Sequence, residues 1–420
     1  MARWDANREY EVTPIPRRPD QLDGRRLFRM IDEHLKHLHN LPTHGNRTFF
    51  YDQLVVAHLL AFFNPAMHSL RRIEDAFDLP AVQRHFGFRG AAKSTVADAQ
   101  RLFDPELLRP IFEDLKQRVN IQPHDARLDQ LTRELIAVDG TFFNVANRIP
   151  WALYNRKSNN GQTPKKTGCR GKTTRGNVRA HVHFDILRGV PDHFTLTGGT
   201  AGEGRQLQSS LRPEHCYVLD RGFQSYNLLD EIVQADSDFV VRLRKNARYE
   251  ELEPRGLTAA DLAAGVETDA LVRVGWRADR TATLPPLRRV AVRVEDKDGP
   301  LVLLTSCLDL PAELIALMYK HRWQVELFFR WLKCMAHLEH FYSESPEGMT
   351  IQVYVTLIAT LLIALETGAR PSVYDFSLMS MVIGGMAPLE EALAVAAKRR
   401  KERERAARRR REKAAKKSSK

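Results

Sequence analysis

Cysteine is scarce in this chain of 420 residues, which has 4 cysteines and no CxxC pair. The scarcity argues against a disulfide framework and against a cysteine zinc site. Long apolar runs are also missing: the longest, "VYVTLIATLLIAL" at 353–365, is shorter than the ~20 residues of a membrane span. We expect it to be a buried helix. The charged opening "MARWDANREYEV" does not fit a secretory signal. We therefore expect a protein of the bacterial cytoplasm, with no membrane partner.

The net charge of the chain is close to zero outside the last 23 residues. The chain has a net charge of +12, and residues 398–420 contribute +11 of it, with 14 Lys or Arg and 3 Glu. Such a block is usually disordered and attracts nucleic acid, although it can also serve solubility alone. A second basic patch, "KKTGCRGKTTRG" at 165–176, is the better candidate for contacting phosphates. Its cations are Lys165, Lys166, Arg170, Lys172 and Arg175.

The amino-terminal third predicts short helices. Apolar residues at helical spacing occur in 25–38 and 48–63, and Ser69 and then Ser94 or Thr95 are suitable N-caps for two further helices. This pattern fits a small DNA-reading domain and equally an ordinary helical bundle. Residues 1–132 are assigned here as a helical amino-terminal DNA-binding domain.

From residue 134 the pattern changes to strands followed by alternating strands and helices, which is typical of an α/β layer architecture. We expect a core over 133–245, a β-rich insertion over 246–310, and core helices over 311–370 that begin near Pro311. A helical region at 371–397 and the basic tail at 398–420 follow.

One run, "YKHRWQVELFFRWLK" at 319–333, carries a single acid among several bases. At about 100° per residue, Tyr319, Arg322, Glu326 and Lys333 fall within an arc of roughly 60° on one helical face, and Arg330 joins that face. A solvated stripe would normally mix Glu, Lys, Gln and Ser. This composition instead suits the grip of a polyanion near a metal ion, although the stripe remains an open alternative.

Two aspartates follow apolar strands. Asp139 comes after "LIAV" and Asp220 after "CYVL", and each has a glycine within two residues. We expect both carboxylates to lie at strand ends and to project into one cleft. Carboxylate oxygens suit hard cations such as Mg²⁺, and two-metal phosphoryl transfer needs several of them on rigid elements. Taken singly, each aspartate could also be an ordinary turn residue.

The stretches "VDGT", "VLDRGFQS" and "YKHRWQVELFFRWLK" resemble the DDE transposases of bacterial insertion sequences, in the group with the YREK signature (insertion-sequence-four type). The signature is Tyr, two residues, Arg, three residues, Glu, six residues, Lys, and Tyr319, Arg322, Glu326 and Lys333 match it without a gap. The resemblance extends from about residue 40 to 370.

The resemblance implies a ribonuclease H-like core with the β-rich insertion between the second aspartate and the glutamate. It implies that Asp139, Asp220 and Glu326 are catalytic and bind two Mg²⁺ or Mn²⁺ ions. Tyr319, Arg322 and Lys333 would hold DNA phosphates, and Arg330 is grouped with them here because it shares their face. Hairpin-forming relatives often place an aromatic wedge in the insertion. Trp276 is the only tryptophan there, but its distance along the chain from Tyr319 does not match the pattern clearly.

The function expected from this resemblance is that of a DNA transposase. It would bind the terminal inverted repeats of its element, cleave their ends and join the 3′ ends to target DNA, as a homodimer associated with the nucleoid. Two alternatives stay open: a metal-dependent DNA nuclease of the same fold without joining activity, and a catalytically idle DNA-binding regulator.

Overall fold

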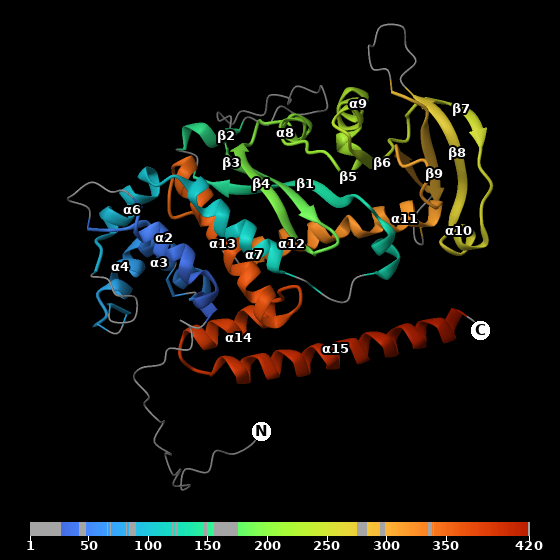
Figure 1. Ribbon diagram of the computed structural model, residues 1–420. Coiled ribbons are helices and arrows are strands. Elements are labelled where there is room, and N and C mark those ends of the chain that lie inside the picture. Colours follow the sequence, from blue (N-terminus) through green and yellow to red (C-terminus); the bar gives the residue numbers. More distant parts are fainter. Residues whose placement is uncertain are drawn as a thin grey trace, which may run out of the picture.

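A computed structural model gives the fold as a mixed α/β arrangement of one large sheet and many helices (Figure 1). The structure describes residues 27–41, 48–64, 66–67, 69–80, 82–83, 90–119, 121, 125–146, 149–154, 175–274, 284–294, 299–334, 338 and 340–418.

The amino-terminal region is helical, as its apolar spacing predicts. Its elements are η1 (Arg29–Ile31), α2 (Asp32–His39), α3 (Tyr51–Phe63), α4 (Leu70–Phe77), α6 (Lys93–Leu102), η2 (Pro105–Leu108), α7 (Arg109–Arg118) and η3 (Ala126–Gln130). Ser69 caps α4 by accepting a hydrogen bond from the Arg72 backbone N–H, which confirms that prediction. The predicted caps of the next helix are wrong, because α6 begins earlier, at Lys93, with Ala92 as N-cap.

Ten strands of the described residues form one mixed sheet, in the order β2-β3-β1-β5-β6-β10-β9-β8-β7, with β4 paired to β3. The strands are β1 (Glu134–Val145), β2 (Leu153–Tyr154), β3 (Arg175–Asp185), β4 (Val190–Gly198), β5 (His215–Leu219), β6 (Asp238–Arg242), β7 (Tyr249–Pro254), β8 (Val266–Val274), β9 (Leu287–Val292) and β10 (Leu301–Thr305). The pairs β1–β5 and β5–β6 are parallel, whereas β4–β3 and β3–β1 are antiparallel.

The predicted β-rich insertion continues this sheet and does not form a sheet of its own, because β10 pairs with β6. Its only described helix is α10 (Ala259–Ala263). A buried ion pair joins β8 and β9: Arg288 Nη2 lies 2.6 Å from Asp269 Oδ2, and both side chains are almost fully buried. Arg288 also donates to the backbone oxygens of Leu308 and Leu310, just before α11. The insertion is therefore tied directly to the start of the helix that leads to Tyr319.

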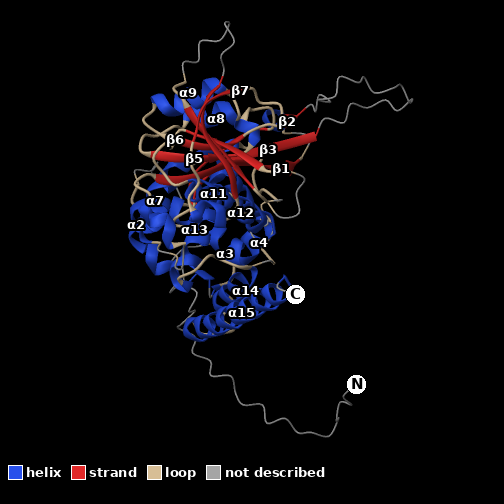
Figure 2. Ribbon diagram, turned by 90° about the vertical axis from the view of Figure 1, so that its right-hand side faces the viewer, coloured by secondary structure: helices blue, strands red, loops and turns tan. Residues whose placement is uncertain are grey.

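Helices cover both faces of the sheet (Figure 2). On one face lie η5 (Arg221–Phe223), α8 (Glu203–Ser209) and α9 (Tyr226–Gln234), whose apolar side chains pack with those of β5 and β6. On the other lie α11 (Ala312–His321), α12 (Trp323–Cys334) and α13 (Pro346–Thr367). The short η4 (Pro150–Ala152) precedes β2. The amino-terminal helices join the core of this second face, because they pack around α13.

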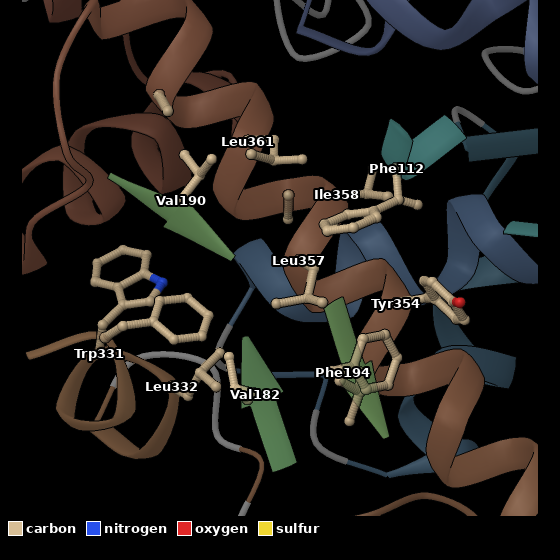
Figure 3. Close-up of a cluster of buried hydrophobic side chains, with 14 of the residues drawn as sticks. Phe112, Val182, Val190, Phe194, Trp331, Leu332, Tyr354, Leu357, Ile358 and Leu361 are labelled. Atoms are coloured by element: carbon tan, nitrogen blue, oxygen red, sulfur yellow. The ribbon is translucent and has the colours of Figure 1, made fainter. Parts of the chain in front are cut away.

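The core of the second face fixes the position of α12. Trp331 and Leu332 of α12 pack among side chains of β3, β4, α7 and α13, and Figure 3 shows this cluster (Val182, Val190, Phe194, Phe112, Tyr354, Leu357, Ile358 and Leu361). Trp331 Nε1 also donates to Thr360 Oγ1 at 3.1 Å. Because the indole is both packed and hydrogen-bonded, α12 cannot rotate without opening the core.

The apolar run at 353–365 lies within α13, a buried helix as expected. Among the described residues, α13 is the one helix long and apolar enough to cross a bilayer, but 89% of its most apolar window is buried within the protein. Its composition is thus explained by the core that it occupies.

The carboxy-terminal part consists of α14 (Val373–Ile383) and α15 (Leu389–Ser418). Leu389, Ala392 and Ala396 of α15 are buried, and the helix then continues without a break through residue 398. The basic segment is therefore helical in the structure, where a disordered block was the usual expectation. Its Ala, Arg, Lys and Glu residues are strong helix formers, so a helix nucleated by the packed first turns can extend through them.

Candidate active site

Asp139 and Asp220 lie on neighbouring parallel strands. The pairing of β1 with β5 ends at Val138 opposite Leu219, and the next residue of each strand is one of the two aspartates. Asp220 follows the end of β5, as predicted. Asp139 does not end its strand, since β1 continues to Val145 along β3. The prediction of a strand end at Asp139 is therefore wrong, but the residue does lie where the parallel pairing stops.

The segment 319–333 forms two consecutive helices, not the single helix assumed in the sequence analysis. α11 ends at His321, α12 begins at Trp323, and Arg322 lies at the break with right-handed helical angles (φ −52°, ψ −33°). The chain direction changes little at such a residue. Tyr319 therefore contacts Asp220, and Arg322 contacts Asp139 and Glu326.

Arg322 connects two of the three predicted acidic residues. Its Nη1 lies 3.3 Å from Asp139 Oδ2, and its Nη2 lies 2.6 Å from Glu326 Oε1. The Arg322 side chain is 12% exposed, against 25% for Asp139 and 31% for Glu326. Burial alone would lower the pKa of Arg322, but Tyr319, Glu326 and Asp139 outweigh that effect and raise it. The guanidinium thus stays charged between two carboxylates.

Asp220 contacts Tyr319. The phenol donates to Asp220 Oδ1 at 3.2 Å, and Arg242 Nη1 lies 3.9 Å from the same oxygen. Burial, opposed by Arg322 and reinforced by Asp220, raises the pKa of Tyr319 to about 12. The phenol therefore keeps its proton and remains a hydrogen-bond donor at neutral pH.

The charge state of Asp139 reflects its neighbours. Burial raises the pKa of this carboxyl above the ordinary value of 3.8, the backbone N–H of Gly140 and the charge of Arg322 oppose the rise, and Glu326 and Asp220 add to it. The Gly140 N–H donates to Asp139 Oδ1 at 2.8 Å. Both of the other predicted acids, Glu326 and Asp220, therefore act electrostatically on Asp139.

A fourth carboxylate, that of Glu203, was missed in the sequence. Glu203 begins α8, and its Oε1 would lie 2.5 Å from a Cβ atom placed on Gly140. Burial raises the pKa of Glu203, Arg179 opposes the rise, and Asp139 and Asp220 reinforce it. In the sequence, "AGEGRQL" looks like an ordinary helix start. The one feature of the sequence that could have indicated a role for Glu203 was its place along the chain, between two strands of the core.

Other predicted site residues contribute less to this geometry. Lys333 is half-buried two turns beyond Glu326 on α12, and Arg330 is exposed; neither forms an ion pair within the described part of the chain. Four cations of the second basic patch (165–176) lie outside the described residues: Lys165, Lys166, Arg170 and Lys172. Arg175 begins β3, but its side chain is also outside the description. Trp276 lies outside it as well.

The donor set fits a hard divalent cation. Asp139, Asp220 and Glu326 offer only oxygen ligands, the type that Mg²⁺ and Mn²⁺ prefer. Within the described residues no three His, Cys, Asp or Glu side chains are already grouped tightly enough to hold an ion. The Arg322 guanidinium lies between Asp139 and Glu326 and compensates their charge through one oxygen of each carboxylate.

Comparisons with known proteins agree with the resemblance. Residues 130–362, more than half of the chain, match the family model described as "Transposase DDE domain". A probable transposase for the insertion sequence element IS5377 from Geobacillus stearothermophilus is 23% identical over 360 residues, covering 84% of this chain and 87% of the relative. The transposase InsG for IS4 from Escherichia coli is 24% identical over 291 residues, 66% of this chain and 61% of the relative. A putative transposase, y4zB, from Sinorhizobium fredii is 28% identical over 204 residues, 47% and 56% of the two chains.

Proposed function

This chain belongs to the DDE transposases of insertion sequences, and from that premise we propose that it cleaves the DNA ends of its own element and joins the 3′ ends to target DNA. Asp139, Asp220 and Glu326 are the proposed metal-binding catalytic residues. The observation that carries the proposal is their convergence: two aspartates follow the last residue pair of adjacent parallel strands, and Arg322 links Asp139 to Glu326.

The strand order supports a ribonuclease H-like core. Three strands in antiparallel succession (β4, β3 and β1) are followed across the sheet by two parallel strands (β5 and β6), with helices on both faces. In this proposal β7 to β10 are the insertion, and α11 and α12 bring Glu326 back to the ends of β1 and β5.

Each proposed role follows from the chemistry of the side chain. Divalent ions at the three acids would activate a water or a 3′ hydroxyl and stabilise the leaving oxygen. Tyr319 offers a protonated phenol, Arg322 a fork suited to phosphate oxygens, and Lys333 a mobile point charge. If Arg322 releases a carboxylate, its donors become available to a DNA phosphate, so the same residue would both link two of the acids and bind substrate.

DNA recognition and assembly are also part of the proposal. The amino-terminal helices and the loop at 165–176 would bind the terminal inverted repeats, and a homodimer would hold two ends together. The reaction would take place in the cytoplasm, at the nucleoid.

A labelled duplex carrying the terminal repeat of the element, incubated with Mg²⁺ and a target plasmid, tests the proposal. We expect cleavage at the repeat and a labelled joined product, both lost in Glu326→Gln with repeat binding retained. Cleavage without joining would indicate the nuclease, and binding without either reaction would indicate the regulator.

A further inference from the structure

A cavity of about 550 Å³ lies on the other side of the α11–α12 junction from the acids. Its walls come from that junction, from the chain before and within α14, and from the first half of α15. Five Lys or Arg side chains and three acids line it, and the five cations are Lys320, Arg370, Arg399, Arg400 and Arg403. We refer to it as the basic cavity.

Two of the three acids of the basic cavity are already compensated. Asp125 makes a two-point ion pair with Arg127, at 2.9 and 2.7 Å. Asp375 caps α14 through Ser372 and lies 3.8 Å from Arg400. The third acid, Glu404, is exposed on α15. Little negative charge therefore remains for the other cations.

Lys320, Arg370 and Arg403 have no carboxylate within ion-pair distance in the described part of the chain. Arg403 lies over the ring of Tyr374, at 5.3 Å from its centroid. Among the described residues, Arg370 donates to Gln324 Oε1 alone. The Arg370 side chain lines the cavity and is exposed to solvent, close to the other cations. Several cations without acidic partners on one surface favour an anionic partner.

The orientation of Arg370 is built into the fold. Gly189, with φ +70° in the β3–β4 turn, lies directly beneath the guanidinium, and a Cβ atom there would lie 2.7 Å from Arg370 Nε. Gln324 is buried; its Oε1 accepts from Arg370, so its Nε2 faces His321 Nδ1 at 2.7 Å. That contact makes Nδ1 the acceptor, which requires the neutral imidazole, and burial lowers the pKa of His321 accordingly. Arg370 is thus held in place by hydrogen bonds through two neutral side chains, Gln324 and His321, which leave its charge uncompensated.

The cations continue beyond the cavity. Residues 405–418 of α15 contain 8 Lys or Arg and 1 Glu, and the helix there stands away from the sheet (Figure 1). A small anion would need only the cavity. A polyanion would contact both the cavity and this helix.

We propose that the basic cavity and the following turns of α15 bind the phosphodiester backbone of DNA at a distance from the cleavage site. This inference rests on the proposed function, in that DNA is the substrate. The cavity side of the junction (Lys320, His321 and Gln324) is opposite to the side that contacts the acids. The bound segment is therefore DNA other than the scissile phosphate.

The test is binding of a fluorescent duplex in EDTA, followed by anisotropy over a range of salt concentrations. Because each neutralised phosphate contributes about 0.9 to the slope of log affinity against log salt, Lys320→Gln with Arg370→Gln should reduce that slope by about 2. The control, Arg273→Gln with Arg293→Gln, removes two charges from exposed ion pairs on β8 and β9 and should change the slope by less than about 0.5. Equal slopes for the cavity variant and wild type, or for the cavity variant and the control, would overturn the proposal.

A second variant separates position from charge. Gly189→Ala keeps the net charge but displaces the Arg370 guanidinium, and we expect about 3- to 10-fold weaker duplex binding. Alanine is strained at φ +70°, so the melting temperature should also fall by a few degrees, and binding is measured well below the unfolding transition. Unchanged binding in a folded Gly189→Ala protein would contradict the built site. Stabilisation by inorganic phosphate, with duplex slopes unaffected by the cavity variants, would indicate a small-anion site and also overturn the DNA proposal.

Failure of this proposal is distinguishable from failure of the proposed function. The binding assay contains no metal and needs no cleavage. A protein that cleaves and joins ends while its cavity variants keep the wild-type slope would retain the catalytic proposal and lose this one.

Discussion

The two sides of the α11–α12 junction differ sharply in their chemistry, although their residues alternate along the chain. Tyr319, Arg322 and Glu326 lie among carboxylates, and the guanidinium of Arg322 is paired twice. Lys320 and Gln324, on the other side, face the basic cavity, where Arg370 has no acidic partner among the described residues. The junction at Arg322 carries both sets of residues. The paired Arg322 compensates two carboxylates, whereas the charge of Arg370 is left for the DNA phosphates that we propose as its ligand.

The largest expected effect comes from the acidic side. Glu326→Gln removes one proposed metal ligand, and loss of several kcal/mol of transition-state stabilisation should slow strand cleavage by at least about 1000-fold. Lys320→Gln on the cavity side should leave cleavage of a saturating, pre-bound end within about 3-fold. Single-turnover cleavage of a labelled end measures both. Similar losses of cleavage rate in the two variants would show that the acidic side and the cavity side do not differ in their role in cleavage.

Substitution of Arg322 and of Arg370 should change the stability of the metal-free protein by different amounts. Arg322→Gln leaves Asp139 and Glu326 uncompensated in a half-buried site, and should lower the free energy of unfolding by about 2 kcal/mol. Arg370→Gln removes an exposed cation that has no acidic partner among the described residues, and should change the free energy of unfolding by less than about 0.5 kcal/mol. Urea unfolding in EDTA gives both values. Added Mg²⁺ should restore part of the loss in Arg322→Gln, because it supplies the missing positive charge.

The pH dependence of metal binding should report the raised pKa of Asp139. A carboxyl with a higher pKa in the folded than in the unfolded state binds its proton more tightly when folded, so its contribution to stability decreases as pH rises through the interval from 3.8 to the folded value. Metal binding needs the ionised form, so Mn²⁺ affinity should increase with pH over the same interval.

Arg322→Gln should move that increase to higher pH, because the charge of Arg322 lowers the pKa of Asp139. Calorimetric titration of Mn²⁺ at a series of pH values from about 4 upward measures the shift. A profile that is identical in the two proteins would show that Arg322 does not control the charge of Asp139.

The smallest expected effect concerns Gly140, next to Asp139. A methyl group there would meet Glu203 Oε1 at 2.5 Å, whereas a Cβ atom on Gly222, two residues after Asp220, meets nothing within 4 Å. Because the end of a glutamate side chain can move, Gly140→Ala should cost less than about 1 kcal/mol of stability. It should still displace the Glu203 carboxylate from Asp139 and lower cleavage several-fold. Gly222→Ala is the matched control. Equal cleavage rates in the two variants would show that the position of Glu203 does not affect cleavage.

Local patterns in the sequence predicted the strands before Asp139 and Asp220 and the helical position of Glu326, but not how these side chains pair. Apolar runs identified the strands before Asp139 and Asp220, and helical arithmetic placed Arg322 beside Glu326. That β1 continues past Asp139 depends on its pairing with β3, a partner distant along the chain. Arg322 also reaches Asp139, because Trp331 and Leu332 pack α12 against the sheet. The spacing of residues within α12 does not predict this packing.

The features missed in the sequence are those that depend wholly on tertiary contacts. Glu203 reaches the site only because α8 crosses β1 at a glycine. The basic cavity joins Gly189 in a turn, Gln324 in α12 and Arg370 before α14, and none of these residues forms a recognisable motif. The helical state of the basic segment follows from the buried first turns of α15, which a charge count cannot reveal.

The most direct test of the central claim is to locate Mn²⁺ by anomalous diffraction from crystals of the protein with a bound DNA end. The account predicts anomalous density in contact with carboxylate oxygens of Asp139, Asp220 and Glu326, with Arg322 moved away from at least one of them. Density at other residues, in a protein that still cleaves the DNA, would contradict it.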